Sequence, residues 1–262
     1  MMRAAVLGSP ISHSLSPLIH NAAYQQLGYP GMYTAIEMAD SNFADFLKSL
    51  DASEWAGLSL TMPLKESALG IVDFVDPVAA RISSGNTVFF EDGKTILCST
   101  DYLAFARIFQ DVKIRKVAII GGGGTARAAL GALTGLVSGV DVLLRSRERI
   151  PKLQQAGQDL DLHFLPLNSS LSDYDLVVST LPAGAADSLA LAVHQARGTL
   201  FEVLYNPWPT QLVAKWQALN LPVIDGFTLL VEQALDQIRI MTGRDFEYTQ
   251  MRQFLNGVVR SA

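Results

Sequence analysis

Four consecutive glycines at positions 121–124 constrain the fold of this chain more than any other feature of its sequence. They follow the apolar segment Val117–Ile120, which is typical of a buried strand, and they precede a helix expected over residues 125–137. Such a turn brings the backbone close to a pyrophosphate, whose charge is favoured by the free N–H groups at the helix start. The pattern G-x-G-x-x-G/A takes small residues at three positions, here Gly121, Gly123 and Ala126. A flexible loop is the alternative, but a further strand at 140–144 completes a strand-helix-strand unit and favours a dinucleotide site.

The segment after that second strand, residues 145–149, contains three arginines and has no carboxylate at the strand tip. In NAD-binding units an acidic residue near this place binds the ribose 2′-hydroxyl, whereas arginine accommodates the 2′-phosphate of NADP. A planar guanidinium matches a phosphate dianion, so Arg145 and Arg149, with Ser146 beside them, favour NADP over NAD. The alternative is an ordinary solvated helix start, where charges often cluster.

More than one hundred residues precede the glycines, so we expect a substrate domain before the cofactor domain. A chain of 262 residues with 49% hydrophobic content can bury the cores of two domains. Its net charge of −5 argues against nucleic-acid partners and against a polybasic membrane surface. The single cysteine, Cys98, excludes intrachain disulfides, and no apolar run or signal segment indicates a membrane or an export route. We therefore predict a cytoplasmic protein, and the spacing of the histidines predicts no metal site.

Strand-like and helical patterns alternate almost throughout, which is typical of an α/β protein with mainly parallel sheets. The N-terminal part predicts strands at 3–7, 32–38 and 57–62, helices at 16–27 and 42–50, and a hairpin over 87–90 and 94–98. After the glycines, strands are expected at 140–144, 163–165, 176–179, 199–204 and 222–224. The last segments, 229–241 and 246–258, have helical periodicity and are expected to pack back on the first domain. The predicted domains are residues 1–102, 103–227 and the returning helices 228–262.

Polar side chains gather at the ends of the expected N-terminal strands, which is where open α/β sheets bind ligands. Ser14 and Ser16 follow the first strand, although Ser16 before a proline also suits a helix N-cap. Lys65 follows the third strand, although a lone lysine is usually solvated. Asn86 lies before the hairpin, and Asp101 begins a helix, where it could serve only as a cap.

In order and spacing, these clusters and the glycine turn resemble the shikimate dehydrogenase family. The matching motifs are Ser14-Leu15-Ser16-Pro17, Thr61-Met62-Pro63-Leu64-Lys65, Asn86-Thr87, Thr100-Asp101, residues 121–126, Tyr205-Asn206-Pro207 and Gln233. The resemblance spans nearly the whole chain. It implies an α/β substrate domain, a doubly wound Rossmann-type NADP-binding domain, and reduction of 3-dehydroshikimate to shikimate on the route to chorismate and the aromatic amino acids.

Reduction of a ketone needs hydride at the carbonyl carbon and a proton at its oxygen, so the site must position an acid. The resemblance implies that Lys65 and Asp101 are this proton-transfer pair. It also implies substrate contacts at Ser14, Ser16, Ser59, Thr61, Asn86, Thr100, Tyr205 and Gln233. The cofactor residues that it implies are Gly121, Gly123, Gly124, Thr125, Ala126, Arg145, Ser146, Arg149, Thr180, Leu204 and Gly226. A small-molecule substrate is the expected partner, and the expected assembly is a monomer or a homodimer.

The sequence departs from the family pattern near the site. Ser59 stands where the family commonly has asparagine, and the segment 83–85 reads Ser-Ser-Gly instead of Gly-Ala-Val. Ser99 and Tyr102 replace the asparagine and glycine that flank the Thr-Asp pair. These differences leave open quinate or another shikimate-like substrate, and also a catalytically silent paralogue that binds NADP or a metabolite. A folate-linked dehydrogenase with a catalytic lysine is a further alternative, which the paired serines and Gln233 fit less well.

Overall fold

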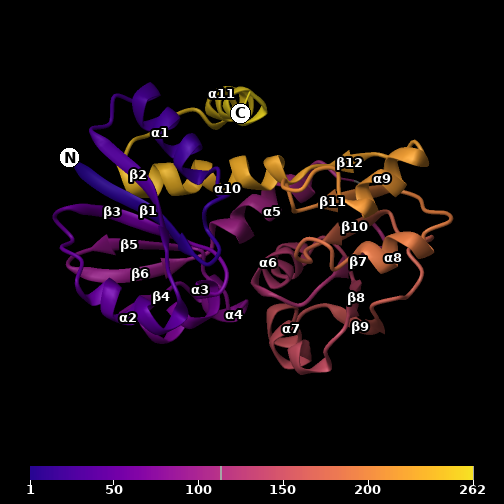
Figure 1. Ribbon diagram of the computed structural model, residues 1–262. Helices are drawn as coiled ribbons and strands as arrows, with labels where there is room; N and C mark the ends of the chain where they lie inside the picture. The colour runs from indigo at the N-terminus through magenta and orange to yellow at the C-terminus, as the bar shows by residue number, and fades with distance from the viewer. Residues whose placement is uncertain (113, 262) are drawn as a thin grey trace. The chain divides into compact units, whose positions relative to one another are not determined.

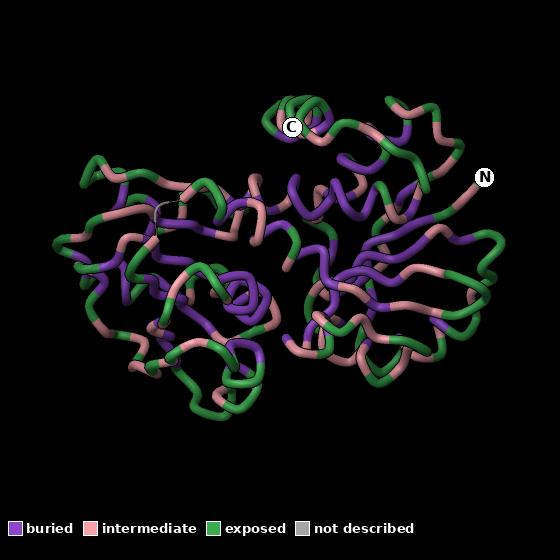
Figure 2. The backbone as a smooth tube through the Cα atoms, turned by 180° about the vertical axis from the view of Figure 1, so that it is seen from behind, coloured by how far each residue is buried: buried purple, intermediate pink, exposed green. Residues whose placement is uncertain are grey.

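The computed structural model describes residues 1–112 and 114–261 (Figure 1). These residues form two compact units: Met1–Leu103 together with the chain from Leu230 onward, and Ala104–Leu229. Each unit has a sheet of six strands within the described residues. The central strands are buried along most of their length, whereas the edge strands contain intermediate and exposed residues (Figure 2). The α/β prediction is confirmed.

The first unit has a mixed sheet in the order β2-β1-β3-β5-β6-β4. Strand β1 pairs in parallel with β2 and β3, whereas β5 pairs antiparallel with β3 and β6. The strands are β1 (Met2–Gly8), β2 (Gly31–Glu37), β3 (Trp55–Leu60), β4 (Phe74–Val75), β5 (Thr87–Glu91) and β6 (Lys94–Cys98). The central strands are almost continuously buried because side chains on both faces of the sheet pack into apolar clusters.

Helices of the first unit follow the strand ends. They are α1 (Ser16–Gln26), α2 (Asp40–Lys48), α3 (Leu64–Ser67), η1 (Ala68–Gly70), α4 (Pro77–Arg81) and the start of α5 (Thr100–Gln110). The short helices α3 and α4 were not predicted, because one turn is too short for an amphipathic period to show. Asp76 caps α4 by accepting hydrogen bonds from the N–H groups of Val78 and Ala79.

The second unit has an all-parallel sheet in the order β12-β11-β10-β7-β8-β9. This order reverses at β7, as in the doubly wound dinucleotide-binding fold. The strands are β7 (Val117–Ile120), β8 (Gly139–Leu144), β9 (Asp161–Pro166), β10 (Leu176–Ser179), β11 (Thr199–Glu202) and β12 (Val223–Ile224). The helices are α6 (Gly124–Leu133), η2 (Arg147–Arg149), α7 (Ile150–Ala156), α8 (Asp187–Ala192) and α9 (Gln211–Ala218).

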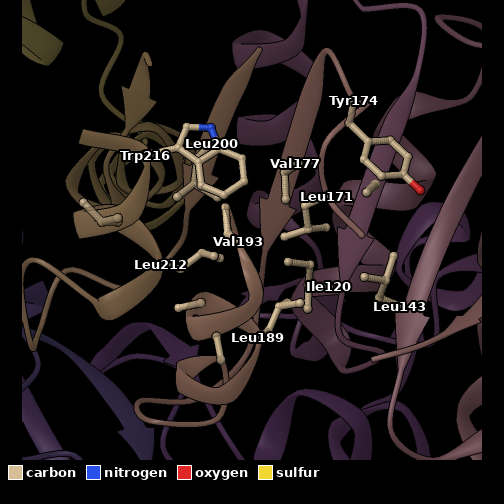
Figure 3. Packing of buried hydrophobic residues seen from close by; sticks show 14 residues of the cluster. Ile120, Leu143, Leu171, Tyr174, Val177, Leu189, Val193, Leu200, Leu212 and Trp216 are labelled. Atoms are coloured by element: carbon tan, nitrogen blue, oxygen red, sulfur yellow. The ribbon is translucent and has the colours of Figure 1, made fainter. Parts of the chain in front are cut away.

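One apolar cluster holds β7, β10 and β11 against α8 and α9 (Figure 3). Trp216 of α9 is fully buried in this cluster, and its Nε1 donates a hydrogen bond to the carbonyl of Gly198 at 3.3 Å. Helix α6 ends four residues before the predicted boundary at residue 137. The backbone leaves the helix at Thr134, which has φ −57 and ψ 126, and Gly135 follows with φ +82, a conformation that glycine adopts readily.

The C-terminal helices are α10 (Gly226–Thr242) and α11 (Tyr248–Arg260). From Leu230 onward the chain belongs to the first unit, and α11 packs on α1, so the predicted return of these helices is confirmed. Glu232 of α10 forms an ion pair with Arg252 of α11. Among the described residues, the helices include none that is long and apolar enough to cross a membrane.

Candidate active site

Lys65 and Asp101 form an ion pair in the first unit. Lys65 lies in the one-turn helix α3, just after β3, and Asp101 lies in the first turn of α5, just after β6. Lys65 Nζ is 2.5 Å from Asp101 Oδ2, and the two side chains are only 18% and 7% exposed. The two residues were expected to act as a pair, and the fold brings them together from 36 residues apart in the sequence.

Asn86 holds the other oxygen of this carboxylate. Its Nδ2 donates to Asp101 Oδ1 at 3.0 Å and to Thr100 Oγ1 at 2.9 Å, while its Oδ1 accepts from the Thr100 N–H at 2.7 Å. Both oxygens of Asp101 therefore accept hydrogen bonds, one from an amide and one from an ammonium group. An ionised carboxylate can accept hydrogen bonds at both oxygens. Because Asn86 holds Oδ1, the other oxygen, Oδ2, is directed at Lys65 and orients its ammonium group.

Asp101 does not cap α5, so the cap interpretation of this residue is wrong. The helix begins at Thr100, and it is Ser99 Oγ that accepts from the N–H of Tyr102 at 3.3 Å. Ser99 thereby does what an N-cap residue does, and the Asp101 carboxylate is left to Lys65 and Asn86.

Ser16, one of the two serines of the N-terminal loop, is also not an N-cap. Helix α1 begins at Ser16 itself, and Ser14 Oγ accepts from the Ser16 N–H at 3.3 Å. Ser14 is half-buried and Ser16 is buried. The carbonyl of Ser16 accepts a hydrogen bond from Nδ1 of His20 at 2.9 Å. Capping therefore does not account for the Ser16 hydroxyl.

The remaining substrate candidates divide between the two units. Gln233 of α10 accepts from Asn86 Nδ2 at 3.3 Å and donates to the Leu230 carbonyl at 2.7 Å. Thr61 is half-buried just beyond β3, and Ser59 is buried within that strand. Tyr205 belongs to the second unit, where its ring stacks on Phe227 with centroids 5.6 Å apart.

The glycine turn of the second unit fits a phosphate group. In the described structure α6 begins at Gly124 without a side-chain cap, and a Cβ added to Gly123 would meet no heavy atom within 4 Å. Gly121 has φ +116, and a Cβ there would lie 2.4 Å from Thr180 Oγ1. The backbone is therefore packed on one side and open at Gly123, where the N–H groups at the start of α6 can receive an anion.

The other residues predicted to bind the cofactor also lie in the second unit. Arg145, Ser146 and Arg149 are exposed after β8, and the stem of Arg149 packs on the turn, 3.0 Å from a Cβ built on Gly122. Leu204 and Gly226 are close neighbours, since a Cβ on Gly226 would lie 2.5 Å from the Leu204 carbonyl group. Thr125 is half-buried and Ala126 is buried in the first turn of α6. Arg127, fully buried, donates to the Gly122 carbonyl at 3.2 Å.

Burial shifts the pKa values of His20 and Cys98 in the first unit. Burial lowers the pKa of His20 from 6.5 to about 4, so its ring is neutral. Burial, with a smaller contribution from the carboxylate of Asp76, raises the pKa of the half-buried Cys98 thiol to about 12. In the described part of the chain no three His, Cys, Asp or Glu side chains are grouped so that they could hold a metal ion.

Comparison with known proteins matches residues 6–88 to the family model of the shikimate dehydrogenase substrate binding domain. The NADP(+)-dependent shikimate dehydrogenase of Methanococcoides burtonii is 34% identical over 254 residues, which cover 92% of each chain. The chain belongs to the shikimate dehydrogenase family. The crystal structure of shikimate dehydrogenase from Mycobacterium tuberculosis is 30% identical, with a TM-score of 0.88 over 98% of this chain and 100% of that one. The Thermus thermophilus enzyme, solved in complex with NADP(H) and shikimate, is 29% identical, with a TM-score of 0.85 over the same shares.

Two positions that depart from the shikimate dehydrogenase pattern have identifiable structural settings. Ser83 stands where the family has glycine, and it keeps a left-handed backbone with φ +50. Gly85 stands where the family has valine, and a Cβ there would lie 2.3 Å from Leu97 Cγ. Leu97 therefore fills the space that the missing side chain leaves.

Two residues with contacts near the site were missed by reasoning from the sequence and the family pattern. Glu37, at the end of β2, accepts hydrogen bonds from the Ser9 hydroxyl and from the Ile11 N–H, and so holds the loop that leads to Ser14. Its place at the carboxyl end of a strand was the available signal. Gln237 lies one helical turn after Gln233, and a second buried glutamine at this spacing was the signal that went unused.

Proposed function

We propose that this protein catalyses the reversible, NADPH-dependent reduction of 3-dehydroshikimate to shikimate, a step toward chorismate and the aromatic amino acids. The observation that carries the proposal is the Lys65–Asp101 ion pair held by Asn86. NADPH, when bound, supplies the hydride. The Lys65 ammonium donates a proton to the oxygen of the ketone and stabilises the alkoxide that develops there. Asp101 orients Lys65 and accepts a hydrogen bond from the substrate hydroxyl.

Substrate recognition is assigned to the polar groups near this pair. Ser14 and Ser16 bind the carboxylate of the substrate, and Thr61, Asn86 and Gln233 bind ring hydroxyls. Ser59, Thr100 and Tyr205 complete the proposed set. A pocket of this kind discriminates against analogues that lack a matching hydroxyl, because its own polar groups would be left buried and unpaired.

The cofactor is assigned to the second unit, residues 103–227 in the predicted division, and the substrate to residues 1–102 with the helices 228–262. The open turn at Gly121, Gly123 and Gly124, with the start of α6, supports binding of the pyrophosphate. Arg145 and Arg149 support selection of NADP by its 2′-phosphate. A cytoplasmic location and a monomeric or homodimeric state stay predictions.

The direct test is steady-state oxidation of NADPH with 3-dehydroshikimate, beside shikimate and quinate in the reverse direction with NADP and NAD. We expect turnover with 3-dehydroshikimate and preference for NADP. Turnover with quinate alone would move the assignment to a quinate dehydrogenase. Binding of NADP without turnover of any of these substrates would indicate a silent paralogue.

The role of Lys65 is tested by Lys65→Ala. Loss of a positioned acid lowers kcat by about 10²–10⁴-fold. Lys94→Ala, at an exposed position at the start of β6, is the matched control. Near-normal turnover of Lys65→Ala with only a weaker substrate affinity would show that Lys65 binds the substrate but does not transfer the proton.

A further inference from the structure

Gln237 is a polar residue whose side chain is buried in the interior of the first unit. It lies on α10, is 1% exposed, and follows Gln233 by four residues, so the two amides project from the same face of the helix. A buried primary amide is stable only when both its oxygen and its nitrogen have partners. Gln237 Oε1 accepts from Ser59 Oγ at 2.8 Å, and Nε2 donates to Thr87 Oγ1 at 3.0 Å and to the Asn86 carbonyl at 3.3 Å.

These partners belong to neighbouring strands. Ser59 of β3 and Thr87 of β5 face each other in the antiparallel register, and the amide of Gln237 bridges them. Ser59 also accepts a hydrogen bond from the hydroxyl of Tyr33 on β2 at 2.6 Å. The hydroxyl hydrogen of Ser59 and one of its lone pairs are thus committed within the protein. Ser59 therefore belongs to this interior network as well as to the proposed set of substrate contacts.

The network continues to the ion pair. Gln237 holds the backbone carbonyl of Asn86, and Gln233 contacts the side-chain amide of the same residue. That side-chain amide in turn donates to Asp101, whose other oxygen meets Lys65. One face of α10 therefore fixes Asn86 at two points, its main chain and its side chain.

We propose that Gln237 is a positioning residue of the active site, which sets the orientation of Asn86 and, through Asn86, that of the Asp101 carboxylate. The inference rests on the proposed function and deepens it. Gln237 is placed one hydrogen bond from Asn86 and so acts on the pair without a contact to Lys65 or Asp101. A misplacement of about 1 Å in a catalytic group can lower the rate by about 100-fold, so a loosened Asn86 has a measurable effect.

The test compares Gln237→Met with Leu235→Ala. Methionine keeps the length and burial of the side chain but makes none of the three hydrogen bonds. Leu235 is fully buried on the same helix and is outside the polar network, so its truncation matches the loss of stability without touching Asn86. We expect Gln237→Met to lower kcat by about 10-fold with an unchanged KM for NADPH, and to displace the pH profile of kcat/KM for 3-dehydroshikimate. Leu235→Ala lowers Tm and leaves kcat and the pH profile as in the wild type.

A rescue experiment separates the hydrogen bonds from the shape of the side chain. Because residues 59 and 87 are direct cross-strand neighbours, an asparagine at position 59 can present its amide to Thr87 once Gln237 is shortened. The double variant Ser59→Asn/Gln237→Ala is expected to recover several-fold of the kcat that Gln237→Ala loses. An equal gain from Ser59→Asn in the chain that keeps Gln237 would assign the gain to a substrate contact and contradict the rescue. If Gln237→Met does not fold, Thr87→Val removes one bond of the amide at a residue outside the proposed substrate contacts, and it is expected to show a smaller change in the same direction.

The results separate this inference from the proposed function. A wild-type chain without turnover on any substrate would overturn both. An active wild type with unchanged kcat and pH profile in Gln237→Met, or equal changes in Leu235→Ala, would overturn the positioning role alone.

Discussion

Acidification is expected to destabilise the first unit through one residue, His20. Its ring lies in α1 with no exposed surface and stacks on Tyr33, with centroids 3.9 Å apart and planes inclined by 16°. Nδ1 donates to the Ser16 carbonyl, so in the neutral ring Nε2 carries no hydrogen. Within the described residues this buried Nε2 makes no hydrogen bond of normal geometry, and its polar neighbour is Gln237. A second proton would therefore place a charge in a site without solvent, and this cost of burial outweighs the hydrogen bonds to Ser16 and Gln237, which act in the opposite direction.

The direction and size of the effect follow from the pKa. Burial lowers the pKa of His20 from 6.5 to about 4 in the folded chain. The unfolded chain therefore binds a proton first as the pH falls, and the free energy of unfolding decreases from about pH 6.5 down to about pH 4. The full difference corresponds to about 3 kcal/mol, of which about 2 kcal/mol is lost between pH 7 and pH 5.

The assay is equilibrium urea unfolding at pH 7 and pH 5, followed through NMR signals of methyl groups in the first unit. His20→Gln removes the titrating ring. We therefore expect the free energy of unfolding of this variant to fall by about 2 kcal/mol less between pH 7 and pH 5 than that of the wild type. His13→Gln, at an exposed position in the preceding loop, is the matched control and keeps the wild-type dependence. An equal pH dependence in His20→Gln and the wild type would refute the reasoning.

Two further predictions concern the cofactor and the backbone. Arg149→Ala is expected to raise KM for NADPH by about 10-fold or more, because a partner of the 2′-phosphate is lost, while KM for NADH changes little. Arg147→Ala is the control. Equal effects of Arg149→Ala on both cofactors would contradict the assignment. Ser83→Gly is expected to raise the free energy of unfolding by about 1 kcal/mol, because φ +50 is strained for serine. Ser84→Gly is its control and is expected to lower stability, as measured by urea unfolding; a loss of stability in Ser83→Gly would exclude strain there.

Regular elements with a clear period could be predicted from the sequence. Strands Val117–Ile120 and Leu176–Ser179 have the predicted bounds, because each is a short apolar run that turn residues delimit. The helix after the glycines was predicted too long because its apolar periodicity continues past Thr134, where the backbone leaves the helix. Hydrophobic spacing in the sequence predicts the presence of a helix or strand well and predicts helix ends poorly.

The candidate site was predicted through motif order and could not be derived from local chemistry. Nothing near Lys65 in the sequence indicates that Asp101 will accept its hydrogen bond. The contact between Gln237 and Asn86 spans 151 residues, and only the folded chain brings them together. The cap of α5 was assigned to the wrong residue for a similar reason. Serine and aspartate both suit an N-cap, and only the tertiary contact of Asp101 with Lys65 shows that Ser99 is the residue that caps the helix.

Cys98 gives the chain a built-in chemical reporter beside the site. It is the single cysteine of the sequence, and its carbonyl accepts a hydrogen bond from the N–H of Asn86 at 3.1 Å. With its pKa raised to about 12, the thiol of the folded chain is almost entirely protonated and reacts slowly with alkylating reagents. Opening of the β5–β6 hairpin would return the thiol to water and lower its pKa toward the ordinary value, so alkylation of Cys98 is expected to speed up when the hairpin next to Asn86 opens. A ligand that stabilises the hairpin next to Asn86 is expected to slow that reaction, whether or not the ligand is turned over.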